Sequence, residues 1–182
     1  MIAFVILHYR AADMTRKCVE RIKALEGDKK IVIVDNASPN GTGQELLDEY
    51  AEDSEIKVIL NPENSGFAKG NNMGVRWVQE NVPADFVVVL NNDVEILQKD
   101  FCPKVEAIYR RHSFDVLGPD IISVFSGIHQ NPKSLHGYSL EAVRKKREKV
   151  ARTKNPILLL LSSGEKNSPA IWKRVQGRRR AK

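Results

Sequence analysis

Apolar runs and segments of helical periodicity alternate along the first part of the chain. Four runs are almost continuously apolar, which is typical of strands buried on both faces of a sheet, at residues 2–7, 30–35, 56–61 and 85–90. Helical periodicity is found between and after these runs, at residues 14–25, 44–53, 67–81 and 101–112. One or two short strands are expected at 115–125. The alternation predicts an α/β fold, a mostly parallel sheet with helices on both faces.

The helices carry local signals of their own. Asp13 and Thr42 are predicted to cap the first two helices, because their side-chain oxygens can accept from the free N–H groups of a first turn. Gly70 and Gly74 lie inside the third helix, where each costs about 1 kcal/mol relative to alanine. Close approach of a ligand or of a strand is the usual compensation for such glycines.

Polar residues follow every predicted strand at its carboxyl end. They are His8, Tyr9 and Arg10, then Asp35 and Asn36, then Asn61 and the loop 64–66, then Asn91, Asn92 and Asp93. The carboxyl ends of parallel strands share one edge of the sheet, and ligands bind in the crevice outside that edge. We therefore predict that these polar residues converge on one crevice.

The sequence LNNDVE at 90–95 places oxygen ligands at alternate positions. If strand geometry continued, Asn91, Asp93 and Glu95 would point to one side. Such ligands suit a hard cation, Mg²⁺ or Mn²⁺, whose shell water and a diphosphate can complete. A turn rich in Asn and Asp between a strand and a helix is the alternative interpretation.

Further positions suit a nucleotide. Asp35 can accept from a ring N–H of a pyrimidine base or from ribose hydroxyls, or it can simply start an Asx-turn. Tyr9 can stack on a base, or it can cap the end of the sheet. A helix opening at 65–66 offers N–H groups to a phosphate, and Lys69 and Asn72 lie one turn apart. Alternatively, the glycines serve helix packing and Lys69 is solvated. The dinucleotide and P-loop signatures are both absent.

Charge is spread unevenly along the chain. The formal net charge is +6, and the basic runs lie at 144–149, 173–174 and 178–182. A basic helix is expected at 138–153. It is either a solvated helix that packs on further chain or a surface attracted to an anionic membrane. Nucleic acid is not expected as a partner, because no aromatic residues alternate with the cations.

Several features favour the cytoplasm. The two cysteines, Cys18 and Cys102, suggest neither a disulfide framework nor a zinc site. No secretory signal is recognisable at the N-terminus. The longest apolar run, 157–161, is too short to span a bilayer. We expect a cytoplasmic protein, which can associate peripherally with the inner face of the cell membrane.

Taken in order, these motifs resemble a known family. The runs AFVILHYR, IVIVDNAS, NPENSGFAKGNNMG, VVVLNNDVEI and VLGPDI are similar to those of family 2 glycosyltransferases with the GT-A, Rossmann-like fold. The rhamnosyltransferase-like branch, which acts in polysaccharide biosynthesis, shows the greatest similarity. The resemblance covers residues 1–125, and 126–182 are expected to form a basic, partly helical extension.

The resemblance implies roles for individual residues. NND at 91–93 occupies the place of the family's D-x-D motif, so Asp93 would ligate Mg²⁺ or Mn²⁺ and Asn91 would lie near the ribose or the metal. Asp35 would hold the base with Tyr9 beside it. Lys69 and Asn72 match polar helix positions near the nucleotide, and with the others they form the predicted nucleotide-binding set.

The resemblance also implies an activity. The expected reaction is metal-dependent transfer of a sugar, with inversion, from a nucleotide-diphospho-sugar (dTDP or UDP) to a saccharide or lipid-linked acceptor. The acceptor half of the family, which supplies the general base, is not recognisable here, so no catalytic residue is predicted. Two alternatives are a nucleotide-sugar-binding fragment without activity and a nucleotidyltransferase. The latter normally has a glycine-rich loop after its first strand, which HYRAADM lacks.

Overall fold

The computed structural model describes residues 1–131, 141, 143–145 and 148. The chain divides into two compact units, Met1–Ser113 and Phe114–Lys182. The strands β1–β4 and the helices α1–α4 all belong to the first unit. The predicted boundary at residue 125 remains a prediction.

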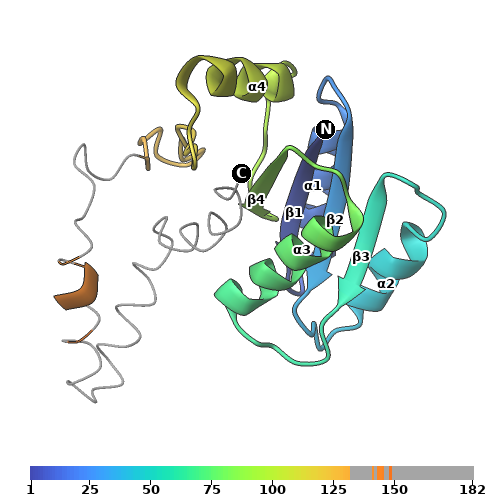
Figure 1. The fold of residues 1–182 in the computed structure, drawn as a ribbon. Coiled ribbons are helices and arrows are strands. Elements are labelled where there is room, and N and C mark those ends of the chain that lie inside the picture. The colour runs from blue at the N-terminus through green and yellow to red at the C-terminus, as the bar shows by residue number, and fades with distance from the viewer. Residues whose placement is uncertain (132–140, 142, 146–147, 149–182) are drawn as a thin grey trace. The chain divides into compact units, whose positions relative to one another are not determined.

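The first unit contains a four-stranded sheet of parallel strands in the order β3-β2-β1-β4. Its elements in chain order are β1 (Ile2–His8), α1 (Ala12–Lys23), β2 (Lys29–Asp35), α2 (Thr42–Glu49), β3 (Ile56–Leu60), α3 (Phe67–Asn81), β4 (Phe86–Asn91) and α4 (Phe101–His112). Figure 1 shows α3 crossing one face of this sheet. The predicted α/β architecture is therefore confirmed.

Successive residues of β1 point to opposite faces of the sheet and so face different helices. Ala3 and Val5 pack with Val75 and Val78 of α3 in one buried cluster. The residues of β1 that alternate with Ala3 and Val5 point to the other face, where His8 contacts Thr15 of α1. Because β1 is buried on both faces, its sequence is apolar without interruption until His8.

Close packing of α3 on the sheet explains its two glycines. A Cβ added to Gly74 would lie 2.5 Å from Val5 Cγ1 and 2.9 Å from Val34 Cγ2. A Cβ added to Gly70 would lie 2.6 Å from Leu7 Cδ1. Approach of strands, rather than of a ligand, thus accounts for both glycines.

Three local predictions are wrong. Asp13 and Thr42 lie inside their helices, and the N-cap positions are Ala11 and Gly41. The side chains of both residues are engaged elsewhere, since Asp13 pairs with Arg16 and the Thr42 hydroxyl contacts His8. Phe67, an apolar residue that the helical periodicity at 67–81 assigns to the core, is 40% exposed.

Both cysteines are free and buried. The Cys18 thiol contacts the backbone oxygen of Asn91 at 4.0 Å. Burial raises the pKa of Cys18 to about 12 and also raises that of Cys102. Neither side chain takes part in a disulfide, as the sequence indicated.

The described part of the second unit contains no named strand. Ile122 and His129 form an isolated antiparallel bridge in place of the strands expected at 115–125. The basic helix predicted at 138–153 and the tail beyond it lie largely outside the described residues. None of the described helices has the length and apolar character that crossing a membrane requires.

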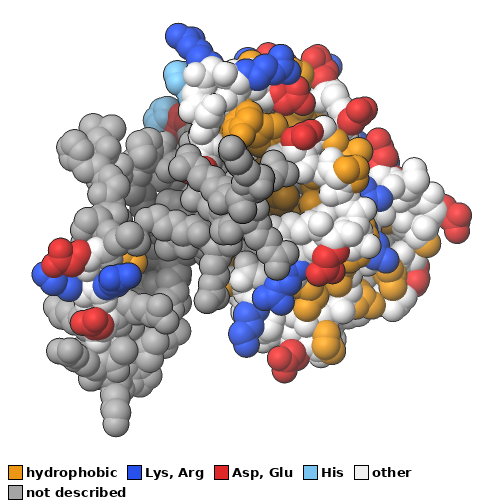
Figure 2. All heavy atoms as spheres, in the orientation of Figure 1, with side chains coloured by type: hydrophobic (Ala, Val, Ile, Leu, Met, Phe, Trp, Pro, Cys, Tyr) orange, Lys and Arg blue, Asp and Glu red, His pale blue; other side chains and the backbone are white. Residues whose placement is uncertain are grey.

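Acidic side chains outnumber basic ones in residues 1–113, and the positive excess lies beyond them. Figure 2 shows acidic and basic side chains interspersed over the visible face of the first unit. The basic character of the chain therefore does not belong to the sheet domain.

Candidate functional site

A hollow of about 200 Å³ lies at the carboxyl edge of the sheet, where β1 and β4 end beside the start of α3. Its lining residues are Leu7, Tyr9, Phe67, Asn91, Asn92 and Asp93. The strand register puts two of these residues on one face of the sheet. Leu7 pairs with Asn91, and both side chains therefore face α3. The structure thus brings together three of the predicted site residues, Tyr9, Asn91 and Asp93.

Asn92 fixes the loop that carries its two neighbours. Its side-chain amide donates to Thr15 Oγ1 at 3.1 Å and to the backbone oxygen of Ala11 at 3.4 Å. Both acceptors belong to the start of α1, on the face of the sheet opposite α3. This anchor holds Asn91 and Asp93 at the mouth of the hollow.

Glu95 does not join Asp93. The strand ends at Asn91 and the chain turns, so Glu95 reaches α1 and pairs with Lys17 at 2.6 Å and Arg21 at 3.0 Å. The hydrogen bonds from Lys17 and Arg21 lower the pKa of Glu95. The expectation that Glu95 would point to the side of Asn91 and Asp93 is therefore wrong.

The hollow offers a metal ion one carboxylate, from Asp93, and the amide oxygen of Asn91. In the described part of the chain, no three His, Cys, Asp or Glu side chains gather closely enough to hold a metal ion by themselves. Mg²⁺ is commonly held by one or two carboxylates together with water and substrate phosphates. The donor set therefore fits such an ion only when a diphosphate completes its shell.

Asp35 lies on the other face of the sheet. Its backbone pairs with His8, so its side chain faces α2 and is 5% exposed. The carboxylate accepts from the Ser38 backbone N–H and hydroxyl. A Cβ added to Gly43 would lie 2.2 Å from Asp35 Oδ2. Asp35 is thus held by its own loop and the first turn of α2, and it does not line the hollow.

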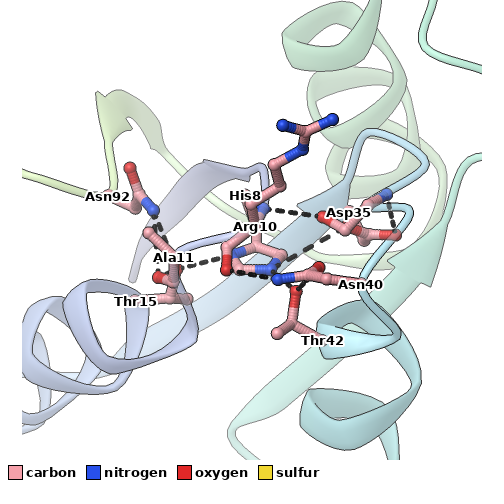
Figure 3. Close-up of polar contacts among 9 residues, drawn as sticks. His8, Arg10, Ala11, Thr15, Asp35, Asn40, Thr42 and Asn92 are labelled. Atoms are coloured by element: carbon pink, nitrogen blue, oxygen red, sulfur yellow. Dashed lines mark hydrogen bonds and ion pairs between the residues drawn. The ribbon is translucent and has the colours of Figure 1, made fainter.

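His8 is the buried centre of a polar network that joins these loops (Figure 3). Its Nδ1 lies 2.7 Å from Thr15 Oγ1, and its Nε2 lies 3.0 Å from Thr42 Oγ1 and 3.9 Å from Asp35 Oδ1. Burial lowers the pKa of His8, although the nearby Asp35 acts to raise it. The sequence placed His8 at a strand end, but gave it no role.

Lys69 and Asn72 line a separate groove of about 600 Å³. Its other lining residues are Ile59, Asn61, Glu63, Ser65, Met73, Arg76, Trp77 and Glu80. On α3, Lys69 and Asn72 lie away from the face that carries Phe67 and the buried glycines. The structure therefore does not bring Lys69 and Asn72 together with Tyr9, Asn91 and Asp93, and their nucleotide contact remains a prediction.

Asn71 is a polar residue that sequence reasoning missed. It is 2% exposed, and its amide nitrogen donates to the backbone oxygen of Phe67 at 3.0 Å. Its Oδ1 has no hydrogen-bond partner among the described residues. The helical spacing 67, 71, 74, 78 contains the signal, because it places Asn71 rather than Asn72 on the inward face.

Comparison with known proteins relates this geometry to a family. Residues 3–164 match glycosyl transferase family 2. The low-salt glycan biosynthesis hexosyltransferase Agl10 of Haloferax volcanii is 26% identical over 122 residues, which cover 67% of this chain and 37% of that protein.

Solved structures show the same fold. S. aureus TarS 1–349 in complex with UDP has a TM-score of 0.53 and 18% identity, covering 67% of this chain and 38% of that chain. The complex with UDP-GlcNAc also has a TM-score of 0.53 and 18% identity, with 67% and 37% covered. The chain thus spans little more than a third of these relatives. Because the family match extends over most of its length, the chain belongs to glycosyl transferase family 2 and has a GT-A-like fold.

Proposed function

We propose that this chain provides the donor-binding part of a glycosyltransferase and takes a nucleotide-diphospho-sugar in the hollow at the carboxyl edge of the sheet. The observation that carries the proposal is that Tyr9 and the pair Asn91 and Asp93, predicted from two separate motifs, line one hollow. A crevice outside the carboxyl ends of parallel strands is where such sheets bind ligands.

In this proposal Tyr9 contacts the base. Its ring is 40% exposed, and the Arg10 guanidinium lies over it, 4.9 Å from the ring centroid. One face of the ring is thus covered by a cation, so a base would stack on the other face or replace the arginine. If the base replaced the arginine, the Arg10 side chain would be free to contact the diphosphate.

In this proposal Asn91 and Asp93 act at the diphosphate. Acidic side chains outnumber basic ones in residues 1–113, so the sheet domain by itself repels a diphosphate. A bound Mg²⁺ or Mn²⁺ would offset the diphosphate charge and stabilise the leaving group. Asp93 would hold the ion, and Asn91 would contact the ion or the ribose.

For Asp35 we propose a role in holding the loop of Ser38 beside the base site. The carboxylate already accepts from the Ser38 N–H and hydroxyl. A direct contact with a base N–H remains a prediction, as do contacts of Lys69 and Asn72 with the nucleotide. An Asp35→Asn variant separates the loop-holding role from direct contact with the base.

The reaction proposed is transfer with inversion to a saccharide or lipid-linked acceptor, in polysaccharide biosynthesis of the rhamnosyltransferase type. UDP or dTDP is the expected donor nucleotide. The general base is expected outside the sheet domain. Family membership favours this activity over that of a nucleotidyltransferase. Donor binding without transfer is the second candidate, because the chain spans only 37% of Agl10.

The proposal includes the location of the protein in the cell. We place the protein in the cytoplasm, with the basic segment beyond residue 138 attracted to the anionic inner face of the cell membrane. Each Lys or Arg near such a surface contributes about 1 kcal/mol. Binding of the full chain to vesicles with and without anionic lipid tests this, and equal binding to both would contradict it.

A thermal-shift panel of nucleoside diphosphates tests the donor site. We expect UDP or dTDP to raise the melting temperature in the presence of Mn²⁺, and purine nucleotides to raise it less. Bound ligand stabilises by about 2.7 kcal/mol at a hundredfold excess over Kd. No shift with any nucleotide, with or without Mn²⁺, would overturn the proposed function.

A further inference from the structure

His8 connects three elements at the carboxyl edge of the sheet. It ends β1 and is completely buried. Its Nδ1 contacts Thr15 of α1 at 2.7 Å, and its Nε2 contacts Thr42 of α2 at 3.0 Å. A buried polar group is expensive unless it is hydrogen-bonded, and this imidazole has a hydroxyl partner at each nitrogen.

The hydroxyl hydrogens determine which ring nitrogen carries the proton. Thr15 Oγ1 lies 2.7 Å from His8 Nδ1 and 3.3 Å from the backbone oxygen of Ala11. A hydroxyl has one hydrogen to donate, and Thr15 can give it either to Ala11 or to Nδ1; the shorter contact favours Nδ1. The Nδ1 atom is then an acceptor, and in a neutral ring the proton lies on Nε2.

The contacts of Thr42 agree with this tautomer. Thr42 Oγ1 lies 2.8 Å from Asn40 Oδ1, closer than its 3.0 Å to His8 Nε2. The amide nitrogen of Asn40 donates to the backbone oxygen of Arg10 at 2.9 Å, which leaves Oδ1 as the acceptor for Thr42. Thr42 therefore donates to Asn40 and accepts from Nε2–H. The same N–H is directed toward the side of Asp35, 3.9 Å away.

The network extends from His8 to each loop of the donor site. Thr15 also accepts from Asn92, which precedes Asp93 in the hollow. In the other direction, the Arg10 N–H donates to the Ser38 hydroxyl at 2.8 Å, and that hydroxyl donates to Asp35. The loop that presents Tyr9 is thus held from both sides (Figure 3).

We propose that neutral His8, as its Nε2–H tautomer, is a positioning residue that holds the Tyr9, Asp35 and Asn92 loops in their donor-binding arrangement. This inference rests on the proposed function of the hollow. His8 touches neither the hollow nor the candidate metal ligands, and it acts through the two threonines. The charged groups that act on it are Asp35 of β2, Arg16 of α1 and Glu45 of α2.

Nitrogen NMR of the histidine rings tests the tautomer in the full chain. The long-range ¹⁵N–¹H pattern distinguishes Nε2–H, Nδ1–H and doubly protonated rings, and a His8→Gln variant assigns the His8 signals among the four histidines. We expect a neutral Nε2–H ring at pH 7. A neutral Nδ1–H ring or a doubly protonated ring at that pH would overturn the assignment.

Nucleotide affinity tests the positioning role. His8→Met fills the space without ring nitrogens, whereas His8→Gln keeps an amide donor and an amide acceptor. We expect His8→Met to weaken UDP binding with Mn²⁺ by about tenfold or more, as loss of an outer-shell partner typically does. His8→Gln should restore most of that loss. The control Ile6→Val alters a buried β1 residue on the same face and should leave affinity unchanged.

The outcomes separate this inference from the proposed function. If His8→Met binds UDP as tightly as the wild type, the positioning role is wrong although the donor site stands. If the wild type binds no nucleotide, the donor site itself is wrong, while the tautomer is still measured. If His8→Met does not fold, Thr15→Val takes its place, because it removes the hydroxyl that joins His8 to Asn92. A tenfold loss of UDP affinity in Thr15→Val would support the inference, and wild-type affinity would contradict it.

Discussion

Asp35 and Asn91 end the two strands that flank β1, but their side chains lie on opposite faces of the sheet. Asp35 pairs with His8, whereas Asn91 pairs with the preceding residue, Leu7. Neighbouring strands are about 4.8 Å apart, so roughly 10 Å separates the two strand ends. The strand ends are close enough for one nucleotide, yet only Asn91 faces the hollow. The proposed role of Asp35 in nucleotide binding therefore requires a contact across the strand ends or an effect through its loop.

Removal of the Asp93 carboxylate should abolish the effect of metal on nucleotide binding. In the wild type, Mn²⁺ should strengthen UDP binding by about tenfold or more, which corresponds to about 1.4 kcal/mol. Asp93→Ala should bind UDP equally with and without Mn²⁺ in calorimetric titrations. The matched control is Glu95→Gln, since Glu95 lies in the same loop but pairs with Lys17 and Arg21. A metal effect that survives in Asp93→Ala, or disappears in Glu95→Gln, would contradict the assignment.

Loss of the Asp35 carboxylate should destabilise the fold. Asp35→Ala leaves the half-buried Ser38 N–H and hydroxyl without their acceptor, which costs about 1 kcal/mol or more. Urea unfolding measures this cost. Asp48→Ala removes an exposed carboxylate from α2 and should change the unfolding free energy by less than about 0.5 kcal/mol. A stability of Asp35→Ala equal to that of the wild type would show that the carboxylate does not hold its loop.

The same position distinguishes two roles in binding. Asp35→Asn keeps an acceptor for Ser38 but removes the charge. If Asp35 contacts the base, this variant should lose its preference for UDP over ADP. If Asp35 only holds its loop, the preference should persist.

A methyl group at Gly74 should be costly although alanine favours helices. The added Cβ would lie 2.5 Å from Val5 and 2.9 Å from Val34, and such overpacking costs about 1–3 kcal/mol. Thermal or urea unfolding of Gly74→Ala checks this. Glu80→Ala, at an exposed position of the same helix, should be neutral or stabilising. If Gly74→Ala were more stable than wild type, close contact with the strands could not be the reason for the glycine.

Stability should fall as pH falls through the range of His8 titration. Burial lowers the pKa of folded His8 below its ordinary value of 6.5. The unfolded chain therefore takes up a proton at a higher pH than the folded chain, so stability is present above pH 6.5 and is lost progressively below it. The slope contributed is at most about 1.4 kcal/mol per pH unit.

Urea unfolding of wild type and His8→Gln between pH 7.5 and 5.5 isolates this effect. The other histidines are common to both proteins and cancel in the comparison. The unfolding free energy of His8→Gln should depend less on pH than that of the wild type. Identical slopes would mean that His8 has the same affinity for protons in the folded and unfolded chains.

The sheet was predictable because each strand is a nearly uninterrupted apolar run that ends in polar residues. The same signal located Tyr9, Asn91 and Asp93 at one edge. The faces of the individual residues were harder to predict, because a shift of one residue between strands changes the face to which a side chain points. Asp35 and Asn91 differ by one such step relative to β1.

The sequence patterns did not predict the side-chain networks. Asn92 is far from His8 and Thr15 in the chain, and it meets Thr15 only through tertiary packing. The cap predicted for α2 failed for the same reason, because Thr42 bonds with His8 rather than with its own helix. Asn71 could have been found from helical periodicity, whereas Asn72 was chosen because it lies one turn from Lys69 and matches a polar position of the family motif.

Amide chemical-shift mapping of the full chain with UDP and Mg²⁺ shows which residues the nucleotide contacts. The proposed donor site requires the largest perturbations at Tyr9 and at 91–93, and smaller perturbations at Lys69 and Asn72 would test the predicted contact of those two residues. Perturbations confined to the groove of Lys69 and Asn72 would contradict the account, as would a spectrum unchanged at saturating nucleotide.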